Sequence, residues 1–145
     1  MATFTCNDME GFLLNMEEFA RLPDDTIADM LEAGAKVVQR AHVEAISSNF
    51  DRRTGRLVGS PKIKMSRKGK STYALIYPQG THHTYHARKG GDATARNADV
   101  GFVHEFGGHG NAAKAWMLNA NEKCSEDMAK AEEQVYDKFL KSLNL

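Results

Sequence analysis

The strongest constraint on the fold is a helical repeat of apolar residues near the end of the chain. Successive members of this repeat are three or four residues apart, which places them on one side of an α-helix. We therefore expect a C-terminal amphipathic helix whose apolar stripe is buried in the core. The stripe consists of Met117, Ala120, Cys124, Met128, Ala131, Val135, Phe139 and Leu143.

A second long helix is expected in the first half of the chain. Residues 24–26 follow Pro23 and supply Asp and Thr side chains that favour a helix start. Apolar residues from Ile27 to Ala45 then lie close to one stripe, and the helix should end between positions 47 and 50. Gly34 lies inside this helix and indicates a close contact with another helix or with a sheet.

Two β-rich runs, 62–65 and 71–77, flank a turn at Gly69 and predict an antiparallel hairpin. Residues 79–99 have little apolar content and predict a long polar loop, and residues 1–22 predict an N-terminal helical arm. The whole pattern predicts one α+β domain over residues 1–145. In it, a small antiparallel sheet packs against the long N-terminal-half helix and the C-terminal amphipathic helix.

Composition excludes several classes of protein. The 145 residues are 41% hydrophobic and 26% charged, as in an ordinary globular chain. Two cysteines are too few for a disulfide framework and match no zinc spacing. No apolar run approaches the roughly 20 residues of a membrane-spanning helix, and the N-terminus does not resemble a signal peptide. We therefore expect no membrane partner.

The charges are unevenly distributed although the formal net charge is zero. Residues 1–50 carry three Lys or Arg against nine Asp or Glu, whereas residues 51–99 carry eleven against three. Such asymmetry indicates either a segment that binds a polyanion or unlike faces that meet in self-assembly. We favour self-assembly, because a chain with no net charge associates more readily than a strongly charged one.

Two groups of histidines in the sequence are candidate metal sites. His104, Glu105 and His109 resemble the zinc-protease pattern H-E-x-x-H with one residue too many. On a helix, positions five apart lie about 140° from each other. We therefore expect a helix or strand end followed by a glycine turn, and a metal hydrolase is a third hypothesis. The second cluster, His82, His83 and His86, is interpreted as part of a solvated loop.

We expect no cofactor, no metal and no catalysis, since no nucleophile, base or phosphate-binding motif is recognisable. A nucleic-acid-binding module that uses the basic 51–70 segment is the main alternative function. Its aromatic neighbours, Tyr73 and Tyr77, both fall inside a predicted strand.

Two motifs, taken in order, carry a family resemblance. Thr54, Gly55 and Leu57 follow the first long helix, with Ser60 soon after. The second motif is an apolar–Glu–Phe–Gly segment ending in Phe106 and Gly107, and Trp116 then opens the last helix. Over roughly residues 25–143 the chain resembles the minor tail-component family of long-tailed bacteriophages, the tail-completion or head–tail joining proteins. Gly108 and Ala115–Trp116 depart from the family's usual Thr and Pro-Phe.

The resemblance implies a structural phage or prophage protein without catalysis. It implies a homo-oligomeric ring, commonly hexameric, that caps the tail tube and meets the head connector, with DNA at most passing through. The protein would then be found in the virion at the head–tail junction, and in the host cytoplasm during assembly. We expect Glu105, Arg52, Arg53 and Arg56 to contact another subunit, and Trp116 to anchor the last helix against the sheet.

Overall fold

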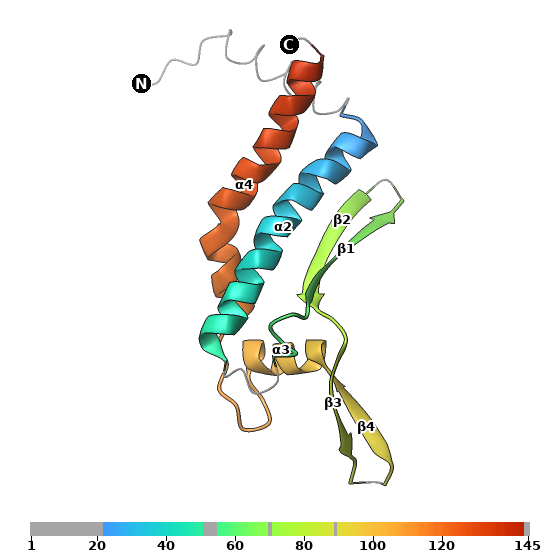
Figure 1. The fold of residues 1–145 in the computed structure, drawn as a ribbon, viewed down its shortest axis with the longest axis vertical. Coiled ribbons are helices and arrows are strands. Elements are labelled where there is room, and N and C mark those ends of the chain that lie inside the picture. Colours follow the sequence, from blue (N-terminus) through green and yellow to red (C-terminus); the bar gives the residue numbers. More distant parts are fainter. Residues whose placement is uncertain (1–21, 51–54, 70, 89, 144–145) are drawn as a thin grey trace, which may run out of the picture.

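The computed structural model describes residues 22–50, 55–69, 71–88 and 90–143. Two long helices, α2 (Asp24–Asn49) and α4 (Trp116–Ser142), lie side by side (Figure 1). Between them in sequence come β1 (Pro61–Lys68), β2 (Ser71–Pro78), β3 (Thr81–His86), β4 (Asp92–Arg96) and α3 (Asn97–Phe106). The α+β class is confirmed. The expected N-terminal arm lies outside the described residues, except for Leu22 at its end. Outside them too are three residues of the predicted sites, Arg52, Arg53 and Thr54. In the described part of the chain, no helix is both long and apolar enough to cross a bilayer.

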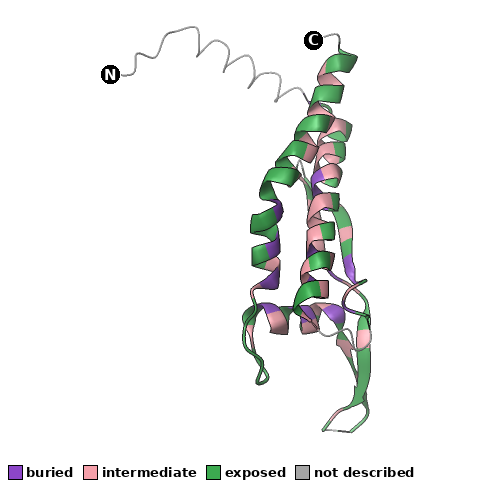
Figure 2. Cartoon of the chain, turned by 60° about the vertical axis from the view of Figure 1, so that its left-hand side comes forward, coloured by how far each residue is buried: buried purple, intermediate pink, exposed green. Residues whose placement is uncertain are grey.

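The two long helices make a close contact at Gly34. A β-carbon at this position would collide with the carboxylate of Glu132 on α4, so the close helix contact predicted for Gly34 is confirmed. The apolar stripe of α4 is buried at Ala120 and Cys124. Further along, Val135 and Phe139 are only half-buried, which corrects the expectation that they belong to the core. Most of the buried residues gather toward the end of the helix pair where α3 packs (Figure 2).

The β1–β2 hairpin confirms the predicted strand pair. Its antiparallel register runs without a break from Pro61 opposite Pro78 to Lys68 opposite Ser71. The hairpin packs on α2, where Gln39 Nε2 donates a hydrogen bond to the carbonyl of Pro61 at 2.8 Å. Among the described residues, α4 contacts α2 and α3 but neither hairpin. The first sheet thus packs on α2, and α4 packs on α2 and α3.

A second hairpin occupies most of the segment expected to be a long loop. β3 and β4 pair antiparallel, with a β-bulge near His83 and a turn in which Gly90 and Gly91 both have φ of 85°. The hairpin extends away from the helix pair (Figure 1), and most of its side chains are exposed on both faces. Because neither face is buried, apolar and polar residues do not alternate in this part of the sequence. The sequence pattern therefore predicts a loop instead of two strands.

The core lies where α2, α3 and α4 meet. Trp116 is 1% exposed and packs with Ile46 and Leu57, and its Nε1 donates a hydrogen bond to the carbonyl of Gly101 at 3.0 Å. Trp116 therefore anchors α4 as expected, but on α2 and α3 instead of on a sheet face. His42, 2% exposed, packs edge-on against the Trp116 ring, with ring centroids 5.4 Å apart.

Candidate functional site: the junction of α3 and α4

α3 begins and ends at residues with specific backbone roles. At its start, the buried Asn97 donates through Nδ2 to the carbonyl of Gln79 at 2.8 Å. At its end, Gly107 has φ of 82°, and a β-carbon there would lie 3.1 Å from the backbone nitrogen of Ala113. The turn therefore requires glycine. The chain then returns toward α4, and the N–H of Lys114 donates to the carbonyl of His104 at 2.8 Å.

The carboxylate of Glu105 caps the start of α4. Glu105 is 7% exposed, and its two oxygens accept hydrogen bonds from the backbone N–H groups of Met117 at 2.6 Å and Leu118 at 3.1 Å. The residue at the usual capping position, Ala115, has no side chain able to do this. A carboxylate also stabilises the positive end of a helix dipole. The carboxylate of Glu105 is therefore engaged within the chain, and the subunit contact expected for this residue stays a prediction.

The two histidines beside Glu105 do not form a zinc-protease motif. The His104 ring packs on Phe50 with centroids 4.5 Å apart, and burial, with the nearby Lys114 charge, lowers its pKa. His109 lies beyond the end of α3 in an exposed turn with φ of 51°. The predicted helix end followed by a glycine turn is confirmed. Within the described ranges, no three His, Cys, Asp or Glu side chains are grouped so that they could hold a metal ion.

Phe106 follows the buried Glu105 but points into solvent. It is 76% exposed, and its ring lies 6.2 Å from that of Phe102, one helical turn earlier and 41% exposed. α3 thus holds a carboxylate inward and presents an aromatic pair outward. The sequence singled out Phe106 only as part of a motif, and nothing in its spacing indicated exposure.

The segment before β1 has a structural role in its described part. Leu57 is buried in the core, and the hydroxyl of the buried Ser60 donates to the carbonyl of Leu57 at 2.6 Å. Gly55 has φ of 67°. Arg56, one of the expected contact residues, is exposed and donates a hydrogen bond to the backbone carbonyl of His82 on β3. It therefore links the start of this segment to the second hairpin.

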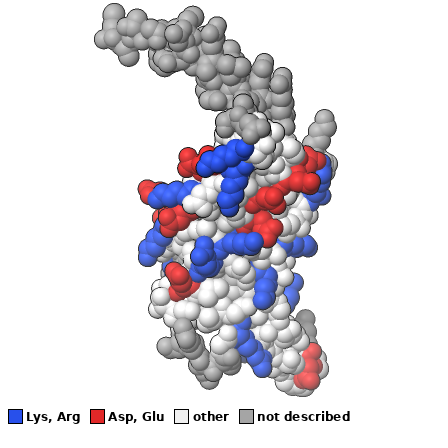
Figure 3. All heavy atoms as spheres, turned by 45° about the horizontal axis from the view of Figure 1, so that its top comes forward, with Lys and Arg blue, Asp and Glu red and all other residues white. Residues whose placement is uncertain are grey.

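Part of the charge asymmetry is balanced inside the chain. Arg67 on β1 forms an ion pair with Asp24 in the first turn of α2. On α4, Lys130 Nζ lies 3.8 Å from a carboxylate oxygen of Asp127. On the face drawn in Figure 3, Lys and Arg are interspersed with Asp and Glu over the upper part of the molecule. The acidic and basic halves of the sequence are therefore not two fully separated faces.

The three histidines of the second cluster lie on β3. The bulge brings the Nδ1 atoms of His82 and His83 within 2.7 Å of each other, although consecutive residues of a regular strand face opposite ways. Desolvation, and the nearby His83 and Arg56, lower the pKa of His82. His86 Nδ1 lies 3.4 Å from an Asp92 oxygen across the hairpin. The solvated loop is thus corrected to a solvated hairpin.

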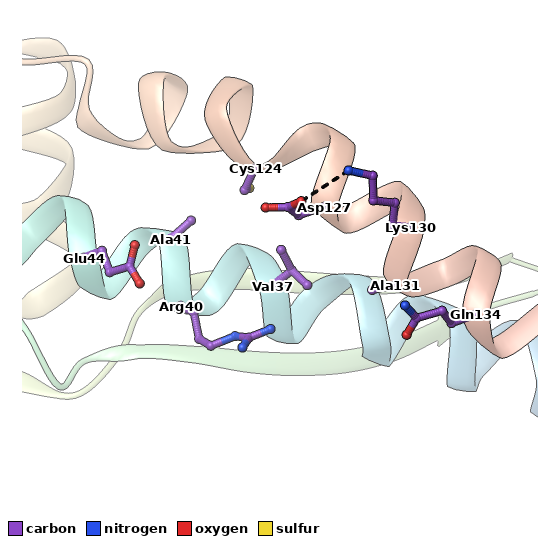
Figure 4. A pocket seen from close by; sticks show the side chains of 9 residues that line it. All are labelled: Val37, Arg40, Ala41, Glu44, Cys124, Asp127, Lys130, Ala131 and Gln134. Atoms are coloured by element: carbon purple, nitrogen blue, oxygen red, sulfur yellow. Dashed lines mark ion pairs between the residues drawn. The ribbon is translucent and has the colours of Figure 1, made fainter.

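A surface groove runs between α2 and α4 (Figure 4). Its lining mixes small side chains with charges of both signs. Burial raises the pKa of the Cys124 thiol, which favours its neutral form. The groove lies where α2 and α4 pack against each other. It is lined by Val37, Arg40, Ala41, Glu44, Cys124, Asp127, Lys130, Ala131 and Gln134.

Comparison with known proteins adds no relative. The chain matches no protein-family model, no curated protein and no solved structure.

Proposed function

We propose that this chain is a structural subunit that assembles with copies of itself into a closed ring, as a tail-completion or head–tail joining component of a phage or prophage. The observation that carries the proposal is the outward aromatic pair on α3. Phe102 and Phe106 are exposed, while Glu105 in the same turn is fixed by its bonds to α4. Aromatic side chains presented on a rigid element are typical anchors of protein interfaces.

The β3–β4 hairpin supports a second contact surface. An isolated two-stranded hairpin is at best marginally stable in water, and its outer edges carry unpaired backbone groups. Here most of the strand residues are exposed. A partner that covers this hairpin would stabilise it. Because α3 and the hairpin offer unlike surfaces, contacts between copies would be heterologous, and these close into rings when the rotation permits.

The head–tail assignment itself rests on the order of the two motifs. Gly55 and Leu57 precede β1, while Phe106, Gly107 and Trp116 form the α3–α4 junction. In this proposal the partners are tail-tube and head-connector proteins, and the protein is in the virion after assembly in the host cytoplasm. Genes for portal, capsid and tail-tube proteins beside this one would support the assignment. Their absence would count against it.

The test of assembly is the mass of the full chain by size-exclusion chromatography with light scattering. We expect the wild type to form an oligomer and Phe106→Ala to shift it toward monomer, because burying a phenylalanine contributes about 1.5–3 kcal/mol per contact. Leu143→Ala is the matched control, since Leu143 is also exposed but lies at the far end of α4. A monomeric wild type at about 100 μM, or an unchanged mass for Phe106→Ala, would contradict the proposal.

A further inference from the structure

The outer face of the β1–β2 hairpin has an unusual composition. The register places Lys62 opposite Tyr77, Lys64 opposite Leu75, Ser66 opposite Tyr73, and Lys68 opposite Ser71. Directly opposed residues of antiparallel strands share a face, and every second residue of a strand faces the same way. These eight residues therefore form one surface, which we call the lysine–tyrosine face.

The opposite side of the hairpin packs on α2. Met65 and Thr72 line a hollow together with Ala28 of α2, and Arg67 pairs with Asp24. The alternate residues consequently face away from the helix, although Ser66 also borders this hollow. Of the described elements, only α2 and α3 pack against this hairpin, and α3 does so near Pro78 at its base.

The lysine–tyrosine face is accessible and carries one sign of charge. Lys62, Lys64 and Lys68 are exposed, and Tyr73 and Leu75 are 36% and 45% exposed. The face has no carboxylate among its eight residues. Within the described residues none of the three lysines forms an ion pair. Their charges are therefore available to an outside anion.

A strand that presents three lysines beside a strand that presents two tyrosines matches the chemistry of a single nucleic-acid strand. Side chains two residues apart on a strand are about 6.6–6.8 Å from each other, which suits successive contacts to an extended phosphate backbone. Proteins that bind single strands combine such a basic track with aromatic rings on which bases stack. We propose that the lysine–tyrosine face binds single-stranded nucleic acid, with the lysines contacting phosphates and Tyr73 stacking on a base. In a duplex the bases are already stacked, so Tyr73 would add little.

The test is fluorescence anisotropy of the full chain with a labelled oligothymidine of about 20 nucleotides. We expect affinity to fall with salt with a log–log slope of about −2, because each of three phosphate contacts contributes about −0.7. Replacing Lys62, Lys64 and Lys68 together by Gln should abolish most of the binding and of the salt dependence. The control replaces three exposed lysines of α4 by Gln, giving the same change in net charge elsewhere: Lys123, Lys138 and Lys141.

Variants of Tyr73 distinguish base stacking from general attraction to a polyanion. Tyr73→Ala should weaken binding of the oligothymidine roughly 5- to 100-fold, whereas Tyr73→Phe should retain it. The proposal is overturned if the wild type binds no oligonucleotide at low salt, or if the α4 control loses as much affinity as the strand variant. The proposal is also overturned if a DNA duplex binds as tightly as the oligothymidine and Tyr73→Ala does not change the affinity for either.

A different outcome is that the wild type binds no oligonucleotide and the variant with Lys62, Lys64 and Lys68 replaced by Gln no longer assembles. The lysine–tyrosine face would then be assigned to a second copy of the chain. That outcome would refute the inference and leave the proposed ring standing. The Phe106 experiment tests assembly through different residues, so either proposal can be refuted while the other stands.

Discussion

Removing the carboxylate of Glu105 should destabilise the fold rather than an interface. In Glu105→Ala, the N–H groups of Met117 and Leu118 lose the acceptors that lie 2.6 and 3.1 Å away. Ala115, at the capping position of α4, has no side chain that could replace them. Both N–H groups would then be left without a protein partner at a junction where Trp116 is almost fully buried.

The size of the effect follows from these contacts. Loss of a helix cap costs about 0.5–2 kcal/mol, and a hydrogen bond to a charged group contributes about 1.5–3 kcal/mol. Because water can reach part of the turn, we expect Glu105→Ala to lower the free energy of unfolding by about 2–4 kcal/mol. Glu105→Gln keeps the shape and one acceptor, and we expect roughly half that loss.

Urea unfolding at low protein concentration measures this free energy, with the transition midpoint falling at an unchanged slope. Glu133→Ala is the control, since Glu133 is exposed on α4 and should change stability by less than about 0.5 kcal/mol. If Glu105→Ala unfolds like the wild type but loses assembly, the carboxylate serves a subunit contact and the capping argument is refuted.

Three further predictions concern packing and protonation. Gly101→Ala should cost about 1–3 kcal/mol in urea unfolding, because the added β-carbon would lie 2.9 Å from Pro78 Cγ. Phe139→Ala should cost about 1–2 kcal/mol in the same assay, less than a fully buried phenylalanine, since Phe139 is half-buried. Burial lowers the pKa of His42 below the ordinary 6.5, so the unfolded chain takes up a proton that the folded chain does not. The free energy of unfolding should therefore fall as pH drops below about 6.5, and His42→Gln should flatten this dependence. The contributions of His82 and His104, whose pKa values are also lowered, would remain.

Each of these predictions has an outcome that would contradict it, and the Gly101 change also has a matched control. Gly59→Ala adds a β-carbon with no atom within 4 Å and should be nearly neutral. A Gly101→Ala protein as stable as the wild type would mean that Pro78 moves aside. A loss near 4 kcal/mol for Phe139→Ala would mean that this ring is buried in the species measured. A pH profile that His42→Gln leaves unchanged would place the proton uptake at another group.

The sequence predicted those helices and strands that have one buried face and one exposed face. The period of α4 and the contact at Gly34 were recognisable because α2 and α4 each bury a stripe. β1 and β2 were recognisable because they are rich in β-forming residues and flank a glycine turn. The β3–β4 hairpin is exposed on both faces, so its residues give no periodic signal, and a loop was the natural interpretation.

The site was predicted less well, because its roles depend on contacts between elements. Spacing identified Glu105, Phe106 and Gly107 as one motif, but it could not show that Glu105 is buried while the next residue, Phe106, is exposed. Tyr73 and Tyr77 follow the basic segment in the sequence, but only the strand register places them on the same face as the lysines. Pairing partners and burial are properties of the fold, so one-dimensional patterns do not contain them.

The contact between Gly34 and Glu132 has a mechanical consequence. Because Gly34 has no side chain, the carboxylate of Glu132 occupies the space above it, and α2 and α4 approach each other closely at this point. The two helices pack against each other along their length. A helix of 27 residues is about 40 Å long, so α2 and α4 together behave as a stiff strut of that length. A force applied at the α3 end of such a strut would be carried toward the opposite end by both helices together.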